Sequence, residues 1–248
     1  MTSPVTHVQL FATCLVDQFY PSVALAAVRL LERLGLAVEV PRDLTCCGQP
    51  AFNGGFQAEA RAMARRTLDV LSRSDNPIVV PSGSCADMVV HRYPELMAGD
   101  PAYADKAARV ASRTYELSQF IVDVLGVTAV GATGHGKVAY HSSCHTQRGL
   151  GVREQPLRLL AGVNSVACRP LPESEACCGF GGLFAVKMAD ISGALLGRKL
   201  DDIEASGAEI VVGTDVSCLM HIGGGLRRRR SAVRVSHLAE ILAPPEET

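Results

Sequence analysis

The feature that most constrains the fold of this 248-residue chain is the spacing of its nine cysteines. Eight of them form two copies of one pattern: a single cysteine, an adjacent pair after 31 or 32 residues, and another single cysteine after 37 or 39 more. The first copy is Cys14, Cys46, Cys47 and Cys85, and the second is Cys144, Cys177, Cys178 and Cys218. Cysteines scattered through a core do not repeat in this way, so we interpret the chain as a tandem duplication.

The segments around the cysteines repeat as well. Each half has three short apolar segments typical of strands, and a cysteine position follows each of them. These segments are Val8–Ala12, Ala37–Val40 and Ile78–Val80, and then Lys137–Tyr140, Ser165–Cys168 and Ile210–Val212. Amphipathic stretches predict helices over Ser22–Leu34, Gln57–Ser72, Glu154–Leu160 and about Val186–Ser206.

Strands that alternate with helices predict βαβ units with a parallel sheet. We therefore expect an α/β fold of two tandem Rossmann-like lobes, related by pseudo-two-fold symmetry. The predicted domains are residues 1–130 and 137–248, joined by a glycine-rich turn at Gly131–Gly136. Because open parallel sheets bind ligands at the carboxyl ends of their strands, each set of four cysteines should gather at one edge of its sheet.

Composition narrows the classes of function. The chain has 24 basic and 25 acidic side chains, which gives no overall positive potential, so we expect no nucleic-acid partner. No apolar run approaches the roughly 18 residues of a membrane span, and Met1–His7 lacks the basic-then-apolar pattern of a signal peptide. We expect a cytoplasmic protein, and a reducing compartment disfavours a disulfide framework.

Four thiolates are the ligand number of a structural zinc site or of an iron–sulfur cluster. Structural zinc sites usually use cysteines two to four residues apart, whereas adjacent cysteines would have to bend one backbone step tightly around a single ion. The glycines that follow the pairs, Gly48 and Gly179, permit a close approach of the backbone to inorganic sulfide. The pattern favours an iron–sulfur cluster in at least one half and leaves zinc open for the other.

Three residues near these sets have less certain roles. Cys168 has no counterpart in the first half, and we expect it to be a buried residue of an apolar strand. His141 and His145 flank Cys144; an ordinary surface role is the commoner one, and tuning of a metal group is the alternative. The segments Gly83–Ser84 and Ser142–Ser143 can supply hydrogen-bond donors to the sulfurs.

The doubled pattern resembles the cysteine-rich CCG domain. That domain occurs in the cysteine-rich component of heterodisulfide reductase, in iron–sulfur subunits of glycolate and anaerobic glycerol-3-phosphate oxidation, and in the lactate utilization protein A family. The segment Cys144–Gly151 and the lack of a ferredoxin segment make the last of these the most similar. The resemblance implies one or two [4Fe-4S] clusters per chain, held by the two cysteine sets. It also implies an electron-transfer subunit of a cytosolic complex that oxidises L-lactate to pyruvate with two partner proteins, one of them ferredoxin-like.

The chain departs from the fullest form of that motif, which ends in a fifth cysteine. Met88 and His221 stand at this position in the two halves. A thioether is a poor ligand for an iron cluster, so we expect an ordinary four-cysteine cluster or, in one half, an isolated metal. His221 is interpreted as a local hydrogen-bonding group at the start of a helix, with ligation as the less frequent alternative.

The chain shows no flavin fingerprint, so its catalytic residues are unassigned and we expect a non-catalytic or co-catalytic subunit of an oxidoreductase. The alternative function is a zinc-binding or thiol-redox scaffold without an electron relay. A disulfide between adjacent cysteines would close a strained ring, and it would leave the duplication of Cys14 and Cys144 unexplained.

Overall fold

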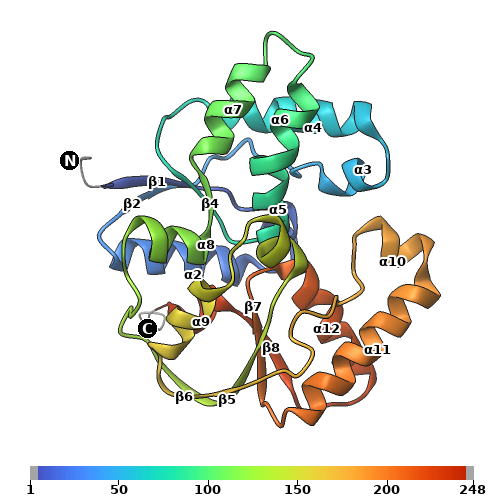
Figure 1. Ribbon diagram of the computed structural model, residues 1–248. Coiled ribbons are helices and arrows are strands. Elements are labelled where there is room, and N and C mark those ends of the chain that lie inside the picture. The colour runs from blue at the N-terminus through green and yellow to red at the C-terminus, as the bar shows by residue number, and fades with distance from the viewer. Residues whose placement is uncertain (1–4, 244–248) are drawn as a thin grey trace.

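The computed structural model describes residues 5–243, so part of the segment inspected for a signal peptide lies outside the described residues (Figure 1). Within these residues the chain folds into two four-stranded parallel sheets. The first sheet has the order β2-β1-β3-β4 and the second the order β6-β5-β7-β8. The strands are β1 (His7–Leu10), β2 (Ala37–Glu39), β3 (Ile78–Val80), β4 (Thr114–Glu116), β5 (Thr133–His141), β6 (Asn164–Arg169), β7 (Ile210–Gly213) and β8 (Arg234–His237). The predicted α/β fold with two similar lobes is confirmed.

Helices and short π-helical turns, marked η, connect the strands. The first half contains α1 (Cys14–Phe19), α2 (Pro21–Arg33), α3 (Gln49–Asn53), α4 (Gln57–Leu71), α5 (Gly83–Asp87), η1 (Met88–Arg92), α6 (Tyr93–Met97), α7 (Ala104–Ser112), α8 (Leu117–Gln119) and η2 (Phe120–Val124). The second half contains η3 (His145–Gly149), α9 (Glu154–Ala161), α10 (Leu183–Lys187), α11 (Ala189–Ala205), α12 (Val216–Arg228) and α13 (Leu238–Leu242).

Helix α2 illustrates how local sequence sets an element's limits. Proline is well tolerated at the first position of a helix, where Pro21 stands. The helix ends before Gly35, whose φ of 86° is a left-handed conformation that glycine adopts readily. Between these limits Val23, Leu30 and Leu31 lie on one buried face of the helix.

The two halves share one hydrophobic core. A single cluster of buried side chains runs from Val8 and Leu30 in the first half to Val138, Ile210 and Leu238 in the second. The contacts between the halves are reciprocal, because α2 packs against α13 while its equivalent α9 packs against α8 and η2. This exchange is typical of a two-fold relationship. Figure 1 shows α5 and α12 near the junction of the halves.

Several predicted limits were wrong. Each sheet has a fourth strand, β4 or β8, beyond the three that the sequence analysis found. The helix expected over Val186–Ser206 begins earlier and is interrupted at Met188, whose φ of −124° and ψ of 50° are not helical. The glycine-rich segment at 131–136 is not a turn throughout, since β5 begins at Thr133. The division into domains at residues 1–130 and 137–248 stays a prediction. Within residues 5–243, no helix is both long and apolar enough to span a membrane.

Candidate metal centres

The eight repeated cysteines lie beyond the carboxyl ends of their strands, as the topology requires. In the first half Cys14 begins α1 after β1, the pair Cys46–Cys47 lies in the loop after β2, and Cys85 lies in α5 after β3. The order β2-β1-β3-β4 places β1 and β3 side by side, at the point where the connections turn in opposite directions. Ligands of open parallel sheets bind at this point. The second half repeats the arrangement with β5, β6 and β7.

In the first set, one sulfur is surrounded by hydrogen-bond donors. Cys46 receives hydrogen bonds from the thiols of Cys14 and Cys47, and the backbone N–H of Gly48 lies 3.5 Å from its Sγ. These bonds lower the pKa of Cys46 to about 3, because they stabilise negative charge on its sulfur. The Sγ of Cys47 also lies 3.3 Å from the Sγ of Cys85. The pKa values of Cys14 and Cys47 are raised, chiefly because each thiol donates its proton to Cys46.

The second set repeats this pattern. Hydrogen bonds from Cys144 and Cys178 lower the pKa of Cys177 to about 2, and the N–H of Gly179 lies 3.3 Å from the Cys177 sulfur. The Sγ atoms of Cys178 and Cys218 lie 3.1 Å apart, and hydrogen bonding between them is the main reason why the pKa of Cys218 falls to about 6. The pKa of Cys144 is raised by its bond to Cys177.

This donor chemistry fits a metal group with several thiolate ligands. Each half gathers four sulfurs from three separate segments, and hydrogen bonds lower the pKa of one of the four. Metal binding to the set would release the remaining thiol protons, which makes binding dependent on pH. The structure therefore brings together, within each half, all four cysteines that the sequence singled out.

The glycines after the cysteine pairs have the conformation that the sequence suggested. Gly48 and Gly179 both have a φ of 86°, which other residues rarely adopt. A Cβ on Gly179 would lie 2.6 Å from the carbonyl oxygen of Ser192. Only glycine at position 179 therefore allows the backbone N–H to face the sulfur of Cys177.

The first cysteine set opens onto a cavity of about 140 Å³ that both halves line. Cys14, Cys46, Cys47 and Cys85 form one side of it. The second half contributes Phe180, Gly181, Gly182, Val216 and Ser217. Residues of the second half therefore form part of the cavity wall that faces the first cysteine set.

The positions of the missing fifth cysteine have structural roles. Met88 is fully buried and packs in the core with Cys47 and Cys85. His221 lies in the second turn of α12 rather than at its start, and its Nε2 is 3.4 Å from the Ser192 hydroxyl. Its ring also contacts Phe180 edge-on. The prediction of a local hydrogen-bonding role for His221 agrees with this contact.

The prediction that Cys168 is buried was wrong. Cys168 is exposed, because β6 is the edge strand of its sheet and most of its residues face solvent. Helix α9, which corresponds to α2, has eight residues where α2 has thirteen, and so covers less of the sheet.

Residues beside the cysteines connect the two halves. The Nδ1 of His145 lies 2.6 Å from Oδ2 of the buried Asp87, and this carboxylate raises the pKa of His145. The backbone N–H of Ser84 donates to Asp215, and the Ser142 hydroxyl donates to Gln147, so these groups bond to oxygens rather than to sulfurs. Neither Asp87 nor Asp215 was predicted from the sequence to have a role at the site. Only the position of Asp215, just before the cysteine-bearing helix α12, hinted at a capping role.

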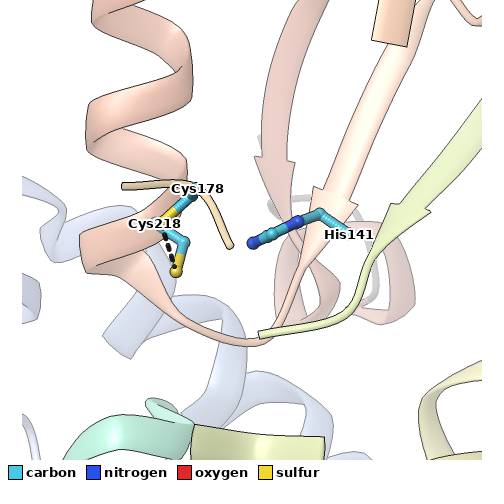
Figure 2. A group of neighbouring side chains, drawn as sticks. All are labelled: His141, Cys178 and Cys218. Carbon is cyan, nitrogen blue, oxygen red and sulfur yellow. Dashed lines mark hydrogen bonds between the residues drawn. The ribbon is translucent and has the colours of Figure 1, made fainter. Parts of the chain in front are cut away.

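A buried histidine lies beside the cysteines of the second half. His141, at the end of β5, is 1% exposed and points toward Cys178 and Cys218 (Figure 2). The possible ligand atoms of these three residues all lie within 4.8 Å of one another. From the sequence, His141 had either a surface role or a role at the metal group, and its burial excludes the surface role.

Comparison with known proteins agrees with this arrangement. The model of the cysteine-rich CCG domain matches residues 8–89 and again residues 138–223. The chain is 48% identical to lactate utilization protein A of Bacillus subtilis over 235 residues, which are 95% of this chain and 98% of that protein. It is also 48% identical to lactate utilization protein A of Geobacillus kaustophilus, with the same coverage.

A solved structure supports the fold alone. A hypothetical protein from Helicobacter pylori superimposes with a TM-score of 0.65 at 10% identity; the match covers 99% of this chain and spans 50% of that protein's length. The doubled domain match and the near full-length identity to the curated relatives establish the family. The chain belongs to the lactate utilization protein A family and carries the cysteine-rich CCG domain twice.

Proposed function

We propose that this chain is an iron–sulfur electron-transfer subunit of a cytoplasmic complex that oxidises L-lactate to pyruvate. The observation that carries the proposal is the convergence, in each half, of four cysteine sulfurs from three separate segments at one edge of the sheet. The name of the curated relatives supports a role in lactate utilisation.

In this proposal the two sets hold one or two [4Fe-4S] clusters. The ligands are Cys14, Cys46, Cys47, Cys85, Cys144, Cys177, Cys178 and Cys218. A bound cluster supplies one-electron transfer at a potential set by its charge, its hydrogen bonds and its burial. The amides of Gly48 and Gly179 donate to the sulfurs and stabilise negative charge there. The hydroxyl of Tyr93 donates to the carbonyl of Cys47 over 2.8 Å and holds the adjacent pair in place.

The proposed partners are two other proteins of the lactate-oxidising complex, one of them ferredoxin-like. We assign this chain a non-catalytic or co-catalytic part, because hydride chemistry at the substrate carbon normally belongs to an organic cofactor, and the sequence has no fingerprint for one. The cavity beside the first cysteine set lies between the halves and has an apolar wall that includes Phe180 and Val216.

Zinc in the second half is the second candidate. Imidazole and thiolate together are a common zinc ligand set, and His141 lies beside Cys178 and Cys218. In that case the chain would combine one electron-transfer centre with one structural metal, or serve as a metal-stabilised scaffold.

Metal analysis of protein prepared without oxygen tests the proposal. We expect about four or eight iron atoms per chain with matching acid-labile sulfide, and visible absorbance that bleaches with dithionite. In the assembled complex, L-lactate should produce the same bleaching, with glycolate as the control for substrate. Stoichiometric zinc without sulfide, and no bleaching, would contradict the electron-transfer function.

A further inference from the structure

The two cysteine sets differ at a buried position beside their sulfurs. Cys144 is equivalent to Cys14, so His141 takes the place that Phe11 has in the first half. Phe11 is 0% exposed and packs in an apolar cluster with Cys47 and Cys85. His141 is equally buried beside Cys178 and Cys218, the equivalents of those two cysteines. Where the first centre has an apolar neighbour, the second therefore has an imidazole.

Apart from the neighbouring sulfurs, the surroundings of His141 give its ring nothing to bind. Among residues 5–243, neither Nδ1 nor Nε2 has a nitrogen or oxygen atom as a hydrogen-bond partner. A buried polar group without such a partner is costly, and a native structure usually retains one for a reason such as a bound ion. Figure 2 shows the ring directed toward the hydrogen-bonded pair of cysteine sulfurs. Histidine, through a neutral imidazole nitrogen, is the commonest metal ligand in proteins.

We propose that His141 is a ligand of the metal group in the second half, together with the cysteines of that half, whereas the first half binds through thiolates alone. This inference rests on the proposed function, in that the second cysteine set holds a metal group. His141, rather than His221, adds the fifth donor to the second set, because His221 contacts the Ser192 hydroxyl and the Phe180 ring instead.

The test uses the full-length chain, labelled with ¹⁵N-histidine and loaded with iron and sulfide without oxygen. Pulsed electron paramagnetic resonance of the reduced protein should show the strong coupling of a metal-bound histidine nitrogen. The coupling should disappear in His141→Phe, which gives the second half the residue of the first, and persist in the matched control His221→Phe. An iron-loaded wild-type protein without this coupling, or coupling that survives His141→Phe, would overturn the inference while leaving the electron-transfer function intact.

If the chain takes up no iron and sulfide, the electron-transfer proposal has failed and the ligand is tested with zinc alone. Zinc titration should then show a site whose affinity falls about 100-fold in His141→Phe and is unchanged in His221→Phe. Equal affinities in wild type and His141→Phe would overturn the inference. Circular dichroism of the metal-free variants checks folding, and His141→Gln, which keeps a polar side chain, replaces His141→Phe if the larger ring prevents folding.

Discussion

The carboxylate of Asp215 in the second half accepts a hydrogen bond from the backbone N–H of Ser84 in the first, with an Oδ2–N distance of 2.7 Å. Its other oxygen, Oδ1, accepts from the N–H of Ser217 at 3.0 Å and so caps Asp215's own helix, α12. Ser82, the equivalent of Asp215, makes no side-chain capping bond to α5. One buried carboxylate therefore caps the two helices that carry Cys85 and Cys218.

Asp215→Asn should destabilise the chain. An amide has one acceptor oxygen, so it cannot cap both helices, and its NH₂ group would face one of the two backbone donors. We expect a loss of about 1–3 kcal/mol in the free energy of unfolding, measured by denaturant titration of the reduced protein. The matched control is Asp105→Asn at an exposed position of α7, which should change stability by less than about 0.5 kcal/mol. Equal stability of Asp215→Asn and wild type would show that the shared cap is unimportant.

Cys178→Ser should remove the metal group of the second half only. Each half gathers its own four sulfurs, so iron and acid-labile sulfide should fall by about four atoms each if both halves are loaded. Cys168→Ser is the control: the side chain is exposed, so metal content should be unchanged and stability altered by less than about 0.5 kcal/mol. Similar metal loss in the two variants would mean that the ligand set is misassigned.

Glu116→Gln should alter how stability depends on pH. Glu116 is fully buried, and this burial raises its pKa from 4.5 to about 7. Between these values the folded state binds more protons than the unfolded state, so stability falls as pH rises. Above pH 7, ionisation of the buried Glu116 carboxyl lowers the free energy of unfolding by about 3 kcal/mol. Glutamine keeps an acceptor for the N–H groups of Ser118 and Gln119 without this cost.

Unfolding of wild type and Glu116→Gln should therefore be compared from pH 4.5 to 7.5. The free energy of unfolding of Glu116→Gln should increase relative to that of wild type as pH rises. For the exposed control Glu59→Gln, the difference from wild type in the free energy of unfolding should stay constant across this range. A constant difference for Glu116→Gln as well would show that Glu116 does not titrate with a raised pKa.

For His237→Asn, stability relative to wild type should depend on pH in the opposite sense to Glu116→Gln. His237 caps α13 as Glu116 caps α8, and burial lowers its pKa from 6.5 to about 4. The neutral form is present in the folded state, so its contribution to stability is complete above pH 6.5 and is lost as pH falls to 4. Asparagine can still cap the helix and does not take up a proton. The stability of His237→Asn relative to wild type should increase as pH falls from 6.5 to 4, whereas exposed His135→Asn should show no such trend. If the stability of His237→Asn relative to wild type decreased as pH fell, His237 would not be a buried neutral histidine.

Gly179→Ala should damage the second centre. The residue has a positive φ, and an added Cβ would clash with the Ser192 carbonyl, so we expect a loss of at least about 2 kcal/mol in stability and reduced metal uptake by that half. In the control Gly193→Ala, the Cβ would meet no atom within 4 Å, and alanine favours helix α11 by up to about 1 kcal/mol. Full metal uptake by Gly179→Ala would show that the glycine conformation is dispensable.

Much of the fold followed from local pattern. The strand Ile78–Val80 was predicted with its observed limits, because three consecutive apolar β-branched residues form a buried central strand. The exposure of Cys168 was missed, since an apolar segment has the same appearance in sequence whether its strand lies at the centre or at the edge of a sheet. The bond between Asp215 and Ser84 joins residues 131 positions apart, and no local signal specifies such a contact.

By itself, the sequence determined the duplication, the parallel α/β halves and the grouping of cysteines by set. These follow from periodicity and from the rule that successive parallel strands present their carboxyl ends at one edge. The tertiary structure alone decided which residues meet across the halves and around the second centre: the shared core, the carboxylate that caps two helices, and the buried imidazole of His141 beside two thiols. These contacts depend on how the two sheets pack, which is set by the summed burial of many side chains rather than by any short segment.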